Sequence, residues 1–281
     1  MPPDIYFVTT RNCNLKCGHC YLSAGPGLEH TTVSTENFQK AVDNLPKKKI
    51  RLVITGGEVF TMQEQLYNYL SIVKRENKER RRTTRKGAES RQITINLQTN
   101  GLWAKSPYAT KKVIKKLSDF EVSYLDVSRD QFHTSQGVTE EALQSIYDVA
   151  KRAGIRTRFG GIDAIGYAFS KGRSAEKTTP NKDTDRSGIL DCNNSLRKQH
   201  LTIREDGRVY SCCYSVFSYP GNLFEEPLES IVAKARQDPA IQEYERGGVA
   251  AIAIAQGHDE KFVAEYVKKN GACALCLKLY G

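Results

Sequence analysis

The sequence has no long hydrophobic run. Its longest stretch of small apolar residues, VAAIAIA at 249–255, is far shorter than the roughly 20 consecutive apolar residues that a membrane-spanning helix needs. The N-terminal sequence MPPDIYFVTT also lacks a basic segment followed by a cleavable apolar stretch, which argues against secretion. We therefore expect a cytoplasmic protein. In that reducing compartment, clustered cysteines bind metals or take part in chemistry rather than pair as disulfides.

No aromatic residue interrupts the densest basic segment. The net charge of the chain is +10, and much of it lies in KRENKERRRTTRKGAESR, residues 74–91. No known nucleic-acid-binding module surrounds this segment. A helix that runs past the core into a solvated loop is therefore the favoured interpretation, and nucleic acid is not the expected partner. An RNA-modifying role stays open as an alternative.

The chain of 281 residues is 39% hydrophobic and 26% charged, which suits a globular protein with an ample core. In its first part, short β-rich runs alternate with amphipathic segments. The predicted strands are 4–10, 50–57, 93–101, 122–129 and 155–162. Helices are predicted to begin at Ser34 and at Ser106-Pro107, and one is predicted to end at Gly154. This alternation predicts an α/β fold with a parallel sheet whose carboxyl-end loops share one edge.

Cysteines or polar residues follow each of the first four predicted strands. They are, in chain order, Cys13, Cys17 and Cys20; Gly56, Gly57 and Glu58; Asn100; and Asp126, Ser128, Asp130 and His133. Each feature alone is weak evidence, since a glycine pair after a strand is often only a turn. Their position at one edge of the sheet predicts a functional site there.

The spacing Cys13-x3-Cys17-x2-Cys20 places three thiols within eight residues. Metal sites built from thiolates alone mostly use four, so a group of three is unusual for a purely structural site. This motif and the Gly-Gly-Glu loop after the second strand resemble the signature of the radical S-adenosylmethionine (SAM) superfamily. The resemblance covers at least residues 4–170 and implies a partial β/α barrel.

The resemblance implies that Cys13, Cys17 and Cys20 hold three irons of a [4Fe-4S] cluster and that SAM chelates the fourth. An electron from the reduced cluster then cleaves SAM to methionine and a 5′-deoxyadenosyl radical, which abstracts hydrogen from an unactivated C–H bond. A reductase such as flavodoxin or ferredoxin is the implied electron donor. The protein positions the cofactor and excludes water.

The resemblance also implies a set of SAM contacts. The candidates are Gly56, Gly57, Glu58, Asn100, Ser128, Asp130 and His19. Asn100 has the alternative of organising its own turn with Gly101, and His19 has that of a structural role. Val59 replaces the proline that usually follows the Gly-Gly-Glu loop. We interpret His133 as a hydrogen-bonded rim residue rather than a catalytic acid.

Beyond the predicted barrel, which we assign to residues 1–170, the composition changes. Residues 171–188 are polar with little periodicity and are predicted to be a linker or mobile loop. A small cysteine-rich domain is predicted over 189–281. Within it, Asp206-Gly207 between alternating residues predicts a β-hairpin over 201–213.

The cysteines of this second domain argue for a metal centre, with zinc as an alternative to iron. The order of a cysteine, a hairpin, the segment GNLFEEPLESI and a C-x2-C pair resembles the SPASM domain. The number of cysteines resembles its shortened form, the twitch domain. This resemblance implies one auxiliary [4Fe-4S] cluster. Its implied ligands are Cys192, Cys212, Cys273 and Cys276.

One cysteine, Cys213, is left over. Adjacent residues of a strand face opposite ways, so Cys213 is not expected to bind the same cluster as Cys212. It is either a buried small hydrophobic residue or a thiol that returns a hydrogen atom to a substrate radical, as an epimerase needs.

Only five strands precede the predicted linker, which suggests a truncated barrel with a wide lateral opening. A sixth strand within 200–205 stays an alternative. We expect a peptide substrate that is epimerised, oxidised or crosslinked, and no leader-recognition domain before Cys13. A dehydrogenase or epimerase of a sugar or aminocyclitol stays open, as does a binding module stabilised by zinc.

Overall fold

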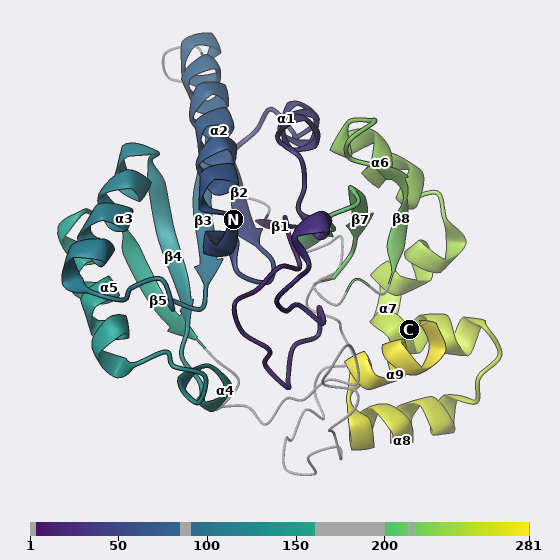
Figure 1. Ribbon diagram of the computed structural model, residues 1–281. Coiled ribbons are helices and arrows are strands. Elements are labelled where there is room, and N and C mark those ends of the chain that lie inside the picture. The colour runs from purple at the N-terminus through teal and green to yellow at the C-terminus, as the bar shows by residue number, and fades with distance from the viewer. Residues whose placement is uncertain (1–3, 85–90, 161–199, 213–214, 216, 281) are drawn as a thin grey trace.

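The computed structural model describes residues 4–84, 91–160, 200–212, 215 and 217–280, except for the side chain of Cys273. Strands and helices alternate from the N-terminus, as predicted, and a helical segment ends the described chain (Figure 1). The strands are β1 (Asp4–Val8), β2 (Ile50–Thr55), β3 (Ile93–Thr99), β4 (Val122–Ser128), β5 (Arg156–Gly160), β6 (His200–Ile203), β7 (Arg208–Tyr210) and β8 (Ser218–Asn222). The helices are η1 (Glu29–Thr31), α1 (Thr35–Asp43), η2 (Val59–Met62), α2 (Gln63–Thr83), α3 (Pro107–Asp119), α4 (Gln131–Thr134), α5 (Glu140–Arg152), α6 (Leu228–Ala235), α7 (Pro239–Ala255), α8 (Glu260–Asn270) and α9 (Ala272–Tyr280).

The described strands form one sheet in the order β5-β4-β3-β2-β1-β6-β7-β8. Neighbouring strands from β5 to β6 in this order pair in parallel, and β7 and β8 add antiparallel pairs. The prediction of an α/β fold with a parallel sheet is therefore confirmed. All the parallel strands present their carboxyl ends at the same edge, which is where the sequence predicted the site.

Strand β6 answers the question of a sixth parallel strand. It lies within the candidate range 200–205 and pairs with β1, from Asp4 opposite His200 to Phe7 opposite Ile203. The sequence thus contains a strand there that the favoured five-strand interpretation left out. Residues 161–199, which include the predicted linker 171–188, lie outside the described residues, so the truncation and the lateral opening stay predictions.

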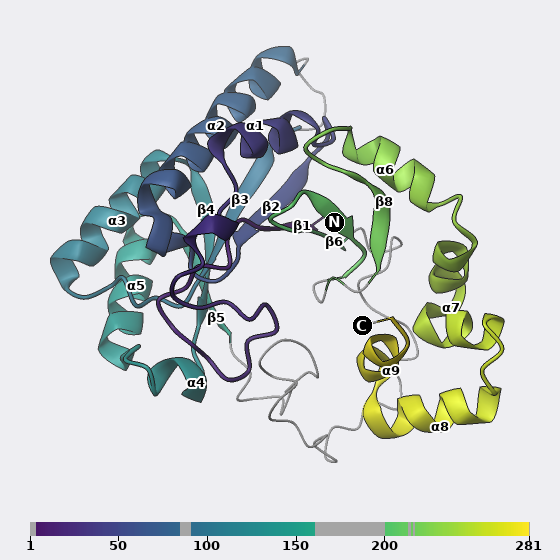
Figure 2. The same ribbon diagram turned by 45° about the vertical axis from the view of Figure 1, so that its right-hand side comes forward.

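Helices α1, α2, α3 and α5 cover one face of the parallel sheet (Figure 2). The predicted helix boundaries are confirmed, because Ser34 caps α1 and Ser106 caps α3 by accepting hydrogen bonds from backbone N–H groups. Gly154 follows α5 with a φ of 75°, the left-handed conformation that favours glycine. The apolar faces of these helices and the strands form one continuous core.

The predicted hairpin is confirmed as β6 and β7, with Gly207 in the turn at a φ of 82°. Helix α6 packs against β8, and α7, α8 and α9 enclose a second, smaller core. Helix α7 is kinked at Gly247 and Gly248. No helix among the described residues is long and apolar enough to span a membrane.

Candidate functional site

The loop after β1, residues 9–28, is the cysteine loop of this protein. It lies beside α4 at the carboxyl edge of the sheet (Figures 1 and 2). Cys13, Cys17 and Cys20 all line a cavity of about 440 Å³. The ends of β2, β3, β4 and β5 line the same cavity, whose size is typical of small-molecule sites. The structure therefore brings the predicted residues of separate loops to one place.

The glycine pair after β2 lets two loops approach each other closely. Gly57 N donates to Thr10 O at 2.8 Å, and Glu58 N donates to Asn12 O at 2.9 Å. A Cβ atom on Gly56 would lie 2.3 Å from Thr10 O, and one on Gly57 would lie 2.3 Å from Asn12 O. Only glycine fits at either position, so the pair fixes the start of the cysteine loop against β2. Both glycines also line the cavity.

Glu58 is turned into the protein and does not line the cavity. Its side chain accepts hydrogen bonds from Phe60 N at 3.0 Å, Asn100 N at 2.6 Å and Thr99 Oγ1 at 2.9 Å. Burial raises the pKa of Glu58, against the lowering effect of these hydrogen bonds. The carboxyl group joins the loop after β2 to the loop after β3, and the direct SAM contact expected of it stays a prediction.

Asn100 takes the turn-organising role that the sequence offered as an alternative. Its Oδ1 accepts from Leu102 N at 3.0 Å. Its Nδ2 donates to Asn14 Oδ1 at 2.8 Å and lies 3.9 Å from Cys13 Sγ. Asn100 therefore also connects the end of β3 to the cysteine loop, and it lines the cavity.

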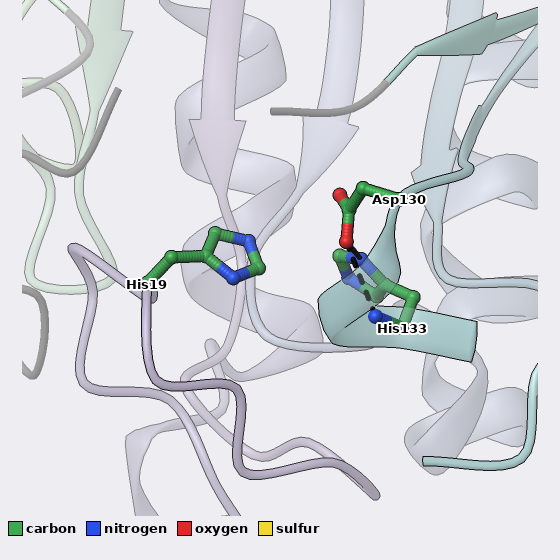
Figure 3. A group of neighbouring side chains, drawn as sticks. All are labelled: His19, Asp130 and His133. Carbon is green, nitrogen blue, oxygen red and sulfur yellow. Dashed lines mark hydrogen bonds and ion pairs between the residues drawn. The ribbon is translucent and has the colours of Figure 1, made fainter. Parts of the chain in front are cut away.

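Asp130, His133 and His19 meet at the cavity wall beyond β4. Figure 3 shows His19 facing the other two from the cysteine loop, and the candidate ligand atoms of all three lie within 4.8 Å of one another. Asp130 Oδ1 accepts from Phe132 N and His133 N and lies 2.6 Å from His133 Nδ1. The position of His133 agrees with the interpretation as a hydrogen-bonded rim residue. Ser128, at the end of β4, lines the cavity beside this group.

The charge states of this pair are coupled. Burial of the His133 ring opposes its protonation, but the hydrogen bonds with Asp130 and Cys17 outweigh burial and raise the pKa of His133 to about 9. Burial likewise tends to raise the pKa of Asp130, but its hydrogen bond with His133 outweighs burial and lowers that pKa. The geometry favours an ion pair that holds Asp130 in one orientation.

Sequence reasoning missed two features of the site. Arg158 on β5 donates two hydrogen bonds to Asp126 on β4, at 3.0 and 3.1 Å, and both residues line the cavity. Asp126 was among the strand-end residues that predicted the site, but its pairing with Arg158 on the neighbouring strand was not predicted. Gln136 contacts Cys17 from the turn between α4 and α5. Only the three-dimensional structure could reveal that contact.

The C-terminal cysteines are described only in part. Cys212 is buried and Cys276, on α9, is half-buried. Cys273 lies on α9 without a described side chain, and Cys192 and Cys213 lie outside the described residues. Strand β7 ends at Tyr210, so the expectation that strand alternation separates Cys212 from Cys213 rests on a wrong premise. The four-cysteine ligand set stays a prediction.

The residues of the cysteine loop fit an iron–sulfur cluster. Burial raises the pKa of the Cys13 thiol to about 12, so a thiolate there needs a bound cation to stabilise it. Three sulfur ligands suit iron, and the cavity beside them has room for a further ligand on an open coordination position.

Comparisons with known proteins agree with this chemistry. The model of the radical SAM superfamily matches residues 7–165, and that of the SPASM iron–sulfur cluster-binding domain matches residues 192–251. The chain is 27% identical over 208 residues to the antilisterial bacteriocin subtilosin biosynthesis protein AlbA of Bacillus subtilis strain 168. This alignment covers 66% of this chain and 44% of AlbA. It is 27% identical over 153 residues to the Fe-coproporphyrin III synthase of Methanosarcina barkeri strain Fusaro, which covers 52% of this chain and 33% of that protein.

The chain thus spans less than half the length of both relatives. The solved structure of native anSMEcpe with bound AdoMet has the same fold, with a TM-score of 0.52, 13% identity and coverage of 96% of this chain and 89% of that chain. The family matches favour iron–sulfur cofactors over the zinc alternative: a [4Fe-4S] cluster with SAM, and an auxiliary cluster in the SPASM domain. This chain belongs to the radical SAM superfamily and carries a C-terminal SPASM domain.

Proposed function

We propose that the enzyme abstracts a hydrogen atom from an unactivated C–H bond of a peptide, and that epimerisation, oxidation or crosslinking of the peptide follows. In this proposal, Cys13, Cys17 and Cys20 hold the SAM-binding cluster. When bound, the reduced cluster cleaves SAM and supplies the 5′-deoxyadenosyl radical. The observation that carries the proposal is that the three cysteines and the ends of four strands line one cavity.

The chain itself binds and orients the reactants. The side chains that we propose to contact SAM all line the cavity; they are His19, Asn100, Ser128 and Asp130. Gly56 and Gly57 add backbone groups beside them. Glu58 has a supporting role, because its buried carboxyl group fixes the loop that carries these glycines. His133 keeps Asp130 in its orientation.

The auxiliary cluster is proposed to bind Cys192, Cys212, Cys273 and Cys276. Bound there, a cluster would supply either an electron acceptor or a binding point for the substrate. An enzyme of this kind needs an electron donor and a reducing compartment, for which we propose flavodoxin or ferredoxin and the cytoplasm. Cys213 is proposed as a hydrogen donor only if the product is an epimer.

The similarity to AlbA supports a peptide substrate, because bacteriocins are peptide or protein products. A small-molecule substrate is the second candidate, and the similarity to Fe-coproporphyrin III synthase favours it. A sugar or aminocyclitol falls in the same class. The two candidates differ in which compound gives up hydrogen, so they can be separated by isotope transfer.

The test uses anaerobically purified enzyme with SAM, dithionite and deuterated compounds. Mass spectrometry measures deuterium in the 5′-deoxyadenosine product. Transfer from members of a deuterated peptide library supports a peptide substrate, whereas transfer only from deuterated aminocyclitols, sugars or coproporphyrins contradicts it. Cys17→Ala is the control and should form no 5′-deoxyadenosine. A wild-type enzyme that binds iron and SAM but never cleaves SAM would overturn the whole proposal.

A further inference from the structure

The side chain of Gln136 joins two segments that lie far apart in the sequence. Its Oε1 accepts a hydrogen bond from Lys16 N at 2.9 Å. Its Nε2 lies 3.2 Å from Cys17 Sγ and donates to Phe132 O at 2.8 Å. One side chain therefore connects α4, the turn before α5 and the middle of the cysteine loop.

The chemistry of the neighbours fixes the orientation of this amide. The backbone N–H of Lys16 can only donate, and the carbonyl oxygen of Phe132 can only accept. Oε1 must therefore face Lys16 and Nε2 must face Phe132, which directs the N–H groups of Nε2 toward Cys17 Sγ as well. The sulfur contact is thus a consequence of two backbone hydrogen bonds on either side of it.

This contact is shorter than two similar contacts of Cys13. Leu15 N lies 3.4 Å and Asn100 Nδ2 lies 3.9 Å from Cys13 Sγ, against 3.2 Å for Gln136 Nε2 and Cys17 Sγ. An N–H group that points at a cluster thiolate stabilises the more negative, reduced form of the cluster. Gln136 is half-buried, so water competes with this interaction only in part.

We propose that Gln136 is a positioning residue that orients the Cys17 thiolate and raises the reduction potential of the SAM-binding cluster. The inference rests on the proposed role of Cys17 as a cluster ligand. Gln136 does not line the cavity, so it acts on SAM cleavage through the cluster and not through contact with SAM or substrate.

The test compares two variants of Gln136 with a matched control. Gln136→Met keeps the length of the side chain and removes both polar groups, whereas Gln136→Glu keeps an acceptor for Lys16 N and replaces the donor with a negative charge. Gln144→Met is the control, since Gln144 bonds only to Asp148 on the exposed face of α5 among the described contacts. Each protein is titrated anaerobically with dithionite, and the EPR signal that changes on addition of SAM is followed.

Gln136→Met should lower the ratio of reduced to oxidised cluster about tenfold at a fixed applied potential, which is about 59 mV for one electron. Gln136→Glu should lower it further, and Gln144→Met should leave it unchanged. The auxiliary cluster should keep its wild-type potential in every variant. Loss of iron from Gln136→Met together with full iron and a lowered potential in Gln136→Glu supports both parts of the proposal.

A wild-type potential in an iron-replete Gln136→Glu variant would overturn the inference. If neither variant binds the cluster while Gln144→Met does, and if the cluster-free proteins unfold at the same temperature, the orienting role stands alone. Failure of the proposed function has a different signature, in which Cys17→Ala keeps its full iron content and the SAM-sensitive EPR signal.

Discussion

The two cysteine-bearing regions differ in what holds their thiols in place. In the cysteine loop, backbone hydrogen bonds of 2.8 and 2.9 Å connect the chain to the loop after β2. Asn100, just after β3, and Gln136, in the turn after α4, add side-chain contacts to the same loop. In the C-terminal region, Cys212 follows β7 and Cys276 lies on α9. The core beneath α9 is small and rich in small side chains: Val249, Ala250, Ala253, Val263, Val267, Ala272 and Leu275.

This difference has a physical consequence. The cysteine loop is shaped by the protein, so a cluster placed there adds chemistry to a site that already exists. The C-terminal helices bury little apolar surface of their own, so a metal bound by Cys212 and Cys276 would act as a crosslink that supports the fold. The N-terminal site is therefore expected to survive metal loss better than the C-terminal region.

The largest effect is expected from removing the thiols of the cysteine loop. A triple variant with alanine at Cys13, Cys17 and Cys20 should not cleave SAM. Its iron content should fall from about eight to about four per chain, because one of two [4Fe-4S] clusters is lost. The melting temperature of the purified protein should not change, because the surrounding protein holds the cysteine loop. Iron analysis, 5′-deoxyadenosine assays and circular dichroism measure these three quantities.

The matched variant replaces both Cys212 and Cys276 with alanine. It should also lose about four irons, but it should lower the melting temperature of the purified protein because the crosslink is gone. If the triple variant unfolds at the lower temperature instead, the contrast between the two regions is wrong.

Substitution of Arg80 tests whether buried polar groups stabilise the N-terminal region that carries the cysteine loop. Its guanidinium, with a side chain only 3% exposed, bonds to Glu76 and to the carbonyl oxygens of Pro46, Lys48 and Arg91. Arg80→Ala removes one of two cationic partners of Glu76 and the donor to these three carbonyls, so it should lower the free energy of unfolding by about 3 kcal/mol or more. Urea unfolding measures this change.

Arg82→Ala is the control, because that side chain is 78% exposed and pairs only with Glu79 among the described contacts. Its effect should stay within about 0.5 kcal/mol. An equal effect of the two substitutions would show that α2 is not held by Arg80. Because Arg80 supports the fold, a variant that neutralises the basic segment 74–91 to test RNA binding should leave Arg80 in place.

The pH dependence of stability tests the contact between Arg80 and Glu76 in a second way. Burial alone would raise the pKa of Glu76, but its hydrogen bonds with Lys47 and Arg80 outweigh burial and lower it. The ionised form therefore stabilises the fold above the unfolded pKa of about 4.3, and this contribution is lost as the pH falls through the lower folded pKa. Cluster-free Arg80→Ala should lose less stability than cluster-free wild type between about pH 7 and about pH 3.

A smaller effect is expected at the glycine pair. Gly57→Ala places a Cβ atom 2.3 Å from Asn12 O, so the cysteine loop must move away from β2. The variant should lose about 1–3 kcal/mol of stability and part of its iron. Gly160→Ala is the control, because a Cβ there meets no atom of the described part of the chain within 4 Å. Equal stability of the two variants would contradict the close approach of the loops.

The sequence was sufficient for much of this site. The cysteine spacing, the glycine pair and the polar strand ends of β3 and β4 all lie where strand–helix alternation predicted them. The burial of Glu58 was not predicted, because its environment depends on three neighbours from two loops. The ligand contact that its charge suggested stays a prediction. The contact of Gln136 with Cys17 could not be predicted, since it depends on how the turn after α4 is placed.

Arg80 was predictable and was missed. The buried face of α2 continues from Leu66 and Leu70 through Val73 and Asn77 to Arg80, at alternating spacings of helical period. The run of charges around Arg80 favoured a solvated helix, although the spacing of buried positions continues into that run. Strand β6 was predicted as part of the hairpin, and a sixth barrel strand in the same range was kept only as an alternative. Its second edge pairs with β1, which the hairpin pattern does not reveal.

The smallest effect is expected from removing iron from the intact protein, which compares the two cysteine-bearing regions most directly. After anaerobic chelation, the amide hydrogens of α8 and α9 should exchange about tenfold faster, which is about 1.4 kcal/mol of lost protection. Those of β2 and β3, whose side chains lie in the main core, should exchange at the same rate as before. Hydrogen exchange with mass spectrometry resolves both regions in one sample, so each serves as the control for the other. If iron removal increases the exchange rate more in the cysteine loop than in α9, then the cluster, and not the surrounding protein, gives that loop its shape.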